Sequence, residues 1–147
     1  MVEFALVVPL FLVLLFGIVD FGLALNDYNS VRQGVREGAR EGVVGELGSA
    51  CTGTGSQRLT CLTEDRIGLD AADTRVRIQL EGAYAVGEQL TVCAQHPIVS
   101  STGMFEPFLG GKVIQSKITM RIESLDADNP ITTTQESALP GKDWAWC

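Results

Sequence analysis

The residues whose types and spacing most clearly predict chemistry are four cysteines: Cys51, Cys61, Cys93 and Cys147. They are far apart, no CxxC pair occurs, and His96 is the only histidine, so we expect no metal site. An even number of widely spaced cysteines in a small domain favours two disulfides and a location outside the cytoplasm. Three pairings remain open, and we prefer Cys51–Cys61 together with Cys93–Cys147.

Motifs of other chemistry are missing from the sequence. It contains neither a GxSxG nucleophile motif nor a Gly-rich phosphate loop, so we expect no enzymatic activity and no cofactor. His96, next to Pro97, has no identifiable partner and is expected on the surface at the end of a strand. The net charge of −7 argues against nucleic acid as a partner, because phosphate binding requires a basic patch.

The elements that would position these residues begin with an apolar segment, residues 4–25, in which Asp20 is the only ionisable residue. As a helix it would be roughly 33 Å long, close to the ~30 Å hydrocarbon thickness of a bilayer. It is apolar on every face, which favours a membrane span over packing on a soluble core. A cleaved signal peptide is disfavoured, because the run is too long and lacks a basic n-region and an A-x-A site.

Basic residues flank only the C-terminal end of this segment. Arg32, Arg36 and Arg40 follow it, so the positive-inside rule alone would place the rest of the chain in the cytoplasm. Disulfides would not persist there. We therefore expect a basic leader that precedes Met1 in the precursor and is removed after insertion, with the C-terminal part outside the cell.

Two carboxylates stand near the ends of the span. Asp20 is expected near a membrane interface, where an ionised carboxylate costs little. Glu3 would be buried among apolar helices in a filament and would need a partner, for which the α-amine of a neighbouring subunit is the candidate. Pro9 is expected to kink or loosen the helix, and two glycines to permit close helix approach, although ordinary membrane-helix roles remain open. The candidate assembly residues are Glu3, Phe4, Pro9, Phe11, Phe16, Gly17, Asp20 and Gly22.

After the span, the helix is predicted to continue to about residue 45, which gives an N-terminal domain of residues 1–46. Gly34, Gly38 and Gly42 recur every four residues and form one ridge, although each costs a helix about 1 kcal/mol. Close packing against another subunit or against the chain's own β domain would compensate for this. A frayed helix end is the alternative, and both remain open.

Residues 47–147 are predicted to form a small β-rich domain, which makes the chain an α+β protein. We expect a stapled loop over 48–60 and a short helix over 63–72. Alternating patterns predict strands over 74–80, 89–95 and 113–124, in an antiparallel sheet with one face covered by the helix and one face wet.

Two further segments of this domain are distinctive. The loop between the last two strands is rich in large apolar residues and is interpreted as a subunit contact, with a lid over the core as the alternative; four residues are the contact candidates. These residues are Met104, Phe105, Phe108 and Leu109. The polar tail, residues 125–147, contains a DADN stretch that resembles part of a calcium loop but lacks its glycine and distant glutamate.

The N-terminal residues carry a family resemblance. VEFALVVPLFLVLLFGIVDFG followed by VRQGVREGARE resembles the N-terminus of TadE-like pilins, type IVb pilus proteins of tight-adherence systems. GEQLTVCAQHPI and KVIQSKITMRIE are similar to the two terminal strands of that family's domain. The resemblance implies cleavage by a prepilin peptidase after a glycine, with a glutamate near the new N-terminus, which Glu3 matches. Such pilins usually carry this glutamate fifth, so either two residues precede Met1 in the mature chain or cleavage falls unusually close.

The expected function is that of a pilin subunit. It would wait in the cytoplasmic membrane, engage a prepilin peptidase and the pilus assembly machinery, and polymerise as a homo-oligomeric helical filament outside the cell for adhesion. Two alternatives remain open. The chain could be a minor pseudopilin that primes or caps the pilus, or a single-pass membrane-anchored adhesin that does not polymerise.

Overall fold

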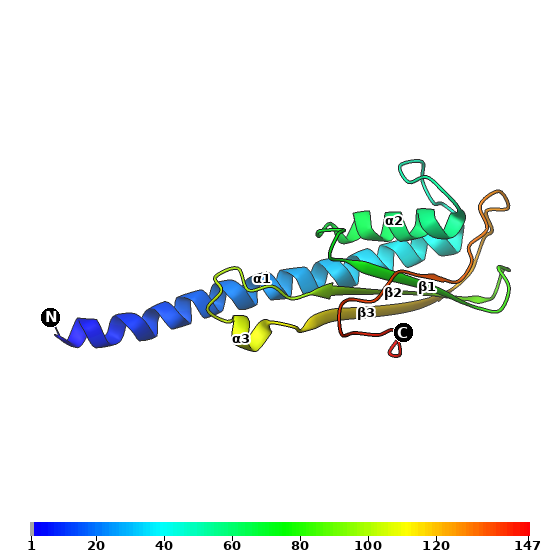
Figure 1. Ribbon diagram of the computed structural model, residues 1–147. Helices are drawn as coiled ribbons and strands as arrows, with labels where there is room; N and C mark the ends of the chain where they lie inside the picture. The colour runs from blue at the N-terminus through cyan, green and yellow to red at the C-terminus, as the bar shows by residue number, and fades with distance from the viewer. Residues whose placement is uncertain (1) are drawn as a thin grey trace.

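The computed structural model describes residues 2–147, so Met1, where the predicted N-terminal domain begins, lies outside the described residues. A 43-residue helix, α1, forms the long axis, and a small α+β domain covers only its C-terminal half (Figure 1). The elements are α1 (Val2–Val44), α2 (Gly55–Ile67), β1 (Arg75–Glu81), β2 (Gln89–Pro97), α3 (Glu106–Leu109), β3 (Val113–Arg121) and β4 (Thr134–Gln135). The α+β fold predicted from the sequence is therefore confirmed.

The four strands form one antiparallel sheet in the order β3-β2-β1-β4. Val92 at the centre of β2 pairs with Ile78 of β1 and with Ile118 of β3. This register places the alternating apolar residues of the three long strands on one face, under the helices. The three predicted strands are present, and the two-residue β4 is an addition that no pattern in the sequence indicated.

Helices α1 and α2 lie side by side on that face of the sheet (Figure 1). The core is filled by fully or almost fully buried residues spaced every four positions along α1, with partners from α2 and the central strands. They are Val31, Val35, Ala39 and Val43 of α1, Leu59 and Leu62 of α2, and Val76, Ile78, Leu90 and Val92 of the sheet. This buried stripe begins after the apolar segment, which therefore contributes little to the core.

The prediction that one face of the sheet is exposed to water is wrong for the central strand, β2. Every residue of β2 from Leu90 to His96 is buried, including the outward-facing Cys93 and Gln95. The C-terminal tail crosses this second face and is tied there by the bond between Cys93 and Cys147. The alternation of apolar and polar residues predicted that this face is exposed to water, but the C-terminal tail covers it.

The predicted loop over 48–60 and helix over 63–72 are also wrong, because α2 begins eight residues earlier, at Gly55. Thr54 is its N-cap and forms a capping box with Gln57, and Gly68 ends the helix with a left-handed φ of 67°. Thr63, at the start of the predicted helix, is instead buried inside α2 and donates its hydroxyl to the Leu59 carbonyl oxygen.

The glycine ridge of α1 packs against the chain's own domain. A Cβ at Gly34 would lie 2.5 Å from the backbone nitrogen of Ile67 in α2, and one at Gly42 would lie 2.9 Å from Leu59 and Leu90 side-chain carbons. Gly38 faces Thr63 in the same way. Helix α1 continues to Val44, so its end is not frayed, and the ridge allows α2 to approach at backbone distance.

Candidate functional site

The N-terminal half of α1 is the most unusual surface of the described chain. Most of its large apolar side chains are exposed, and very few residues of the apolar segment are buried. The helix is thus long and apolar enough to cross a membrane by length and composition. Among the predicted assembly residues, Glu3, Phe4 and Phe11 are exposed, and the helix runs through Pro9 without interruption.

Asp20 departs from its apolar surroundings, because only 2% of it is exposed. Its carboxylate accepts hydrogen bonds from the Ser100 hydroxyl at 2.6 Å, the Thr102 hydroxyl at 2.7 Å and the Thr102 backbone N–H at 3.1 Å. Ser100 also accepts a bond from the Gly103 N–H at 3.0 Å, which holds the turn. Sequence reasoning missed these partners, which lie 80 or more residues from Asp20 along the chain.

The same loop, residues 98–109, packs on α1 and is called the docking loop below. Phe105 stacks edge-on against Phe21, with ring centroids 5.8 Å apart, and its Cζ lies 3.2 Å from where a Cβ would stand at Gly17. Leu109 is buried, whereas Met104 and Phe108 are 44% and 67% exposed. Of the four predicted contact residues, these two therefore remain available to another molecule.

A shallow apolar groove runs along α1 beside Phe105. It has a volume of about 400 Å³ and almost no polar lining. The residues that line it are Val13, Leu14, Gly17, Ile18, Phe21 and Phe105. The predicted assembly glycine Gly17 thus lies under the docking loop. At Gly22, apart from the adjacent backbone of α1, no described atom lies within 4 Å of where a Cβ would stand.

Both disulfides form with the preferred pairing. Cys51–Cys61 ties the segment before α2 to α2 itself, and Cys93–Cys147 ties the tail to β2 across 54 residues. Trp144 packs beside Trp146 at 5.8 Å and donates its indole N–H to the Glu136 carbonyl at 3.0 Å. The tail is thereby fixed on the sheet.

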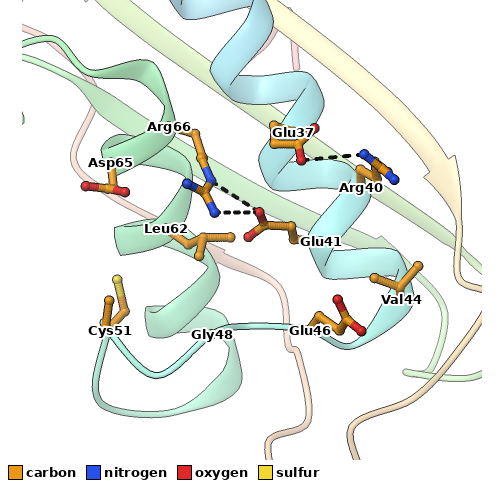
Figure 2. Close-up of a pocket in the computed structure, with 11 residues that line it drawn as sticks. Glu37, Arg40, Glu41, Val44, Glu46, Gly48, Cys51, Leu62, Asp65 and Arg66 are labelled. Atoms are coloured by element: carbon orange, nitrogen blue, oxygen red, sulfur yellow. Dashed lines mark hydrogen bonds and ion pairs between the residues drawn. The ribbon is translucent and has the colours of Figure 1, made fainter.

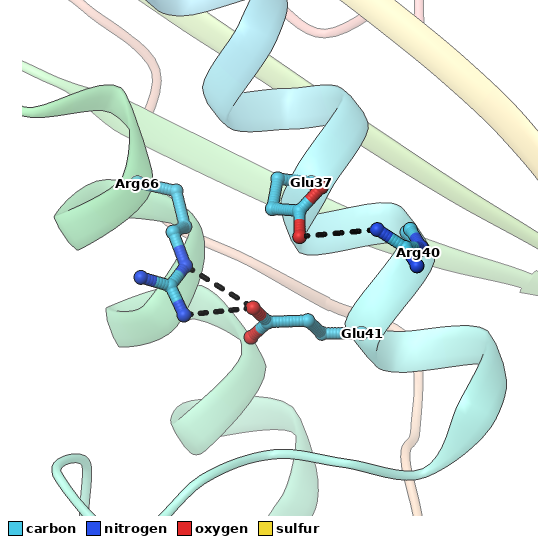
Figure 3. Close-up of polar contacts among 4 residues, drawn as sticks. All are labelled: Glu37, Arg40, Glu41 and Arg66. Atoms are coloured by element: carbon cyan, nitrogen blue, oxygen red, sulfur yellow. Dashed lines mark hydrogen bonds and ion pairs between the residues drawn. The ribbon is translucent and has the colours of Figure 1, made fainter.

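A polar groove of about 560 Å³ lies between the end of α1 and α2 (Figure 2). Arg66 donates to one oxygen of Glu41 through Nη2 at 2.8 Å and Nε at 3.1 Å, and Arg40 lies 3.7 Å from Glu37 (Figure 3). The bond to Glu41 raises the pKa of Arg66. Since both arginines are paired inside the chain, this groove is best explained as the α1–α2 junction.

The polar tail begins with a turn that is held by hydrogen bonds between its own residues. The carboxylate of Asp126 accepts bonds from the Asp128 and Asn129 backbone N–H groups and from the Asn129 amide. The bond from the Asn129 amide, more than any other, lowers the pKa of Asp126. Within the part of the chain that the structure describes, no group of three or more potential metal-ligating side chains gathers.

His96 is not the surface residue that the sequence predicted, because it is only 8% exposed. Strand β2 continues past it to Pro97, and its ring faces the helices with Nδ1 3.0 Å from the Thr74 hydroxyl. Burial lowers the pKa of His96. Its role in the structure is that of a hydrogen-bonded core histidine.

Glu64 of α2 and Glu136 beside β4 form a close carboxyl pair. Burial and then the charge of Glu136 raise the pKa of Glu64 to about 7, with Arg75 opposing the shift. Glu136 itself accepts the Val76 backbone N–H at 2.7 Å, so it is held in place next to Glu64. The folded protein therefore binds the Glu64 proton more tightly than the unfolded chain does.

This pair predicts a pH dependence of stability. The contribution of Glu64 is largest below its unfolded pKa of 4.5 and is lost as the pH rises through about 7. Because Glu64 is partly exposed, we expect a loss on the order of 1 kcal/mol. Urea unfolding in detergent at about pH 5 and about pH 8 should give a smaller change for Glu64→Gln than for wild type. Glu81→Gln, on an exposed residue, should behave as wild type, and equal changes in all three would contradict the prediction.

The fold and the exposed segment define a class, namely an α+β protein carried on an N-terminal helix able to cross a membrane. Residues 1–40, almost the whole of α1, match the family model described as TadE-like protein. The N-terminal helix is thus similar to that of TadE-like proteins, and the match confirms the resemblance over these residues. No curated protein and no solved structure matches the chain.

Proposed function

We propose that the chain is a structural subunit of a tight-adherence pilus, which polymerises through α1 into an extracellular filament for adhesion. The observation that carries the proposal is the exposed apolar half of α1, joined by one continuous helix to a disulfide-bonded domain. An apolar surface of this size needs a cover. Lipid covers it in the membrane, and the helices of neighbouring subunits cover it in a filament.

In this mechanism the precursor is stored in the cytoplasmic membrane with its domain outside. A prepilin peptidase removes the leader, and the assembly machinery extracts the subunit. Helix–helix contacts then replace lipid contacts, and small residues bring helix backbones close. Gly22 is available for such a neighbour, because apart from the adjacent backbone of α1 no described atom lies within 4 Å of its Cβ position.

Glu3 provides the test. It is exposed at the start of α1, but a filament core would bury its carboxylate, which then needs the α-amine of a neighbouring subunit as partner. Glu3→Ala should abolish most filament formation and leave the domain folded. Glu81→Ala, which removes an exposed carboxylate at the end of β1, is the matched control. Filaments sheared from cells are counted by electron microscopy and identified by mass spectrometry.

The outcomes separate the alternatives. Filaments made chiefly of this chain support the proposal, and a normal yield from Glu3→Ala would remove Glu3 from the mechanism. Filaments that contain only traces of the chain would overturn the main-subunit role in favour of a minor pseudopilin. Recovery of the chain solely in the membrane fraction would overturn polymerisation and favour an anchored adhesin.

A further inference from the structure

The docking loop meets α1 inside the segment that the sequence predicts to span the membrane. Its hydrogen bonds end on Asp20, and Phe105 rests on Gly17 and Phe21. Any medium that surrounds α1 at this level therefore also surrounds the docking loop. The depth of α1 in a bilayer therefore determines whether the docking loop lies in water, among headgroups or in lipid.

A hydrocarbon core that covered all of residues 4–25 would enclose the backbone of Ser100 to Gly103. Non-helical backbone exposed to lipid is strongly disfavoured, because its polar groups lose their water. The helix from residue 4 to residue 19 is only about 24 Å long, a few ångströms shorter than the ~30 Å of a typical core. A bilayer accommodates such a short span by thinning or by drawing flanking apolar residues into the boundary.

The docking loop supplies flanking residues of this kind. Met104 and Phe108 are exposed on it, next to Phe105, and Glu106 is the only charged residue between positions 98 and 109. The ring of Phe108 lies 6.3 Å from that of Phe105, and Phe105 lines the apolar groove on α1 between Val13 and Phe21. Asp20, the one carboxylate at this level of α1, has three protein donors and does not need water.

We propose that in the membrane-anchored subunit the docking loop lies in the outer boundary of the bilayer and sets the depth of α1. Asp20 with Ser100 and Thr102 lies at headgroup level, and Met104 and Phe108 enter the acyl region. The hydrocarbon core then covers about residues 4–19, and the domain stands at a fixed height above the membrane. This inference rests on the membrane-anchored stage of the proposed function and not on polymerisation.

Lipid quenching of tryptophan fluorescence tests the inference on the full chain. Phe108→Trp and, as a matched control, Val86→Trp are each reconstituted in phosphatidylcholine vesicles with acyl chains brominated near the headgroup. Val86 is similarly exposed, at 61%, but lies in the β1–β2 hairpin at the far end of the domain (Figure 1). The wild-type signal of Trp144 and Trp146 is subtracted.

We expect brominated lipid to remove most of the added emission of Phe108→Trp and almost none of that of Val86→Trp. The triple variant Ser100→Ala, Thr102→Val, Phe108→Trp lacks both hydroxyl donors to Asp20 and should be quenched less. Retained circular dichroism of the triple variant shows that its domain remains folded. Absence of quenching at position 108, or equal quenching at 86 and 108, would overturn the inference.

The two proposals fail separately. Quenching at position 108 in a chain that never forms filaments supports the membrane inference and contradicts polymerisation. An unquenched position 108 that becomes protected only when the protein self-associates would instead assign the exposed apolar tip to a second copy of the chain, and would overturn the membrane inference.

Discussion

Gly34→Ala is expected to lower the free energy of unfolding by about 2–3 kcal/mol, a large effect for the addition of one methyl group. The new Cβ would lie 2.5 Å from the backbone nitrogen and 2.6 Å from the Cα of Ile67. Backbone atoms cannot rotate away as a side-chain end can, so α2 must move off α1. This movement opens the core around Val31 and Val35, which are completely buried.

The gain in helix propensity from glycine to alanine, about 1 kcal/mol, opposes this loss but does not cancel it. Gly22→Ala isolates that gain, because apart from the adjacent backbone of α1 no described atom lies within 4 Å of its Cβ position. Urea unfolding in detergent, followed by tryptophan fluorescence, should therefore show Gly34→Ala below wild type and Gly22→Ala equal to it or above. A Gly34→Ala protein as stable as wild type would mean that α1 and α2 are not packed at backbone distance.

Helix α1 and the three long strands could be predicted because their signals are local and periodic. An uninterrupted apolar run specifies a helix without reference to the rest of the chain, and the alternation in β3 specifies which residues face the core. The glycine ridge was also visible in the sequence. Its partner was not, because nothing local indicates that Ile67 lies opposite Gly34.

The wrong predictions have physical causes as well. The predicted helix start at residue 63 treated Thr63 as an N-cap, but Thr54 is an N-cap candidate too. Gln57 favours Thr54, because it completes a capping box only there. The covered face of β2 and the partners of Asp20 depend on segments distant in sequence, the tail and the docking loop. Contacts of this kind leave no periodic trace.

The second large effect is expected from removal of the Cys93–Cys147 bond. The double variant Cys93→Ala, Cys147→Ala should lose about 4 kcal/mol, because the bond closes 54 residues and constrains the unfolded chain accordingly. A small domain with a modest core depends strongly on such a constraint. The matched variant Cys51→Ala, Cys61→Ala opens only 10 residues and should lose about 3 kcal/mol by the same relation.

Loss of the Cys93–Cys147 bond should also expose a particular region of the folded protein. Arg77 of β1 donates to the Trp144 carbonyl at 3.1 Å, and Trp144 covers the sheet, so a released tail would expose the second face of β2. Hydrogen exchange should therefore rise in residues 134–147 and in β2 of the Cys93/Cys147 variant before global unfolding. In the Cys51/Cys61 variant it should rise around α2 instead. If the two variants lost equal stability and showed the same exchange pattern, the tail would not contribute to the packing of the sheet. The predicted difference in exchange follows from the tail covering the second face of the sheet.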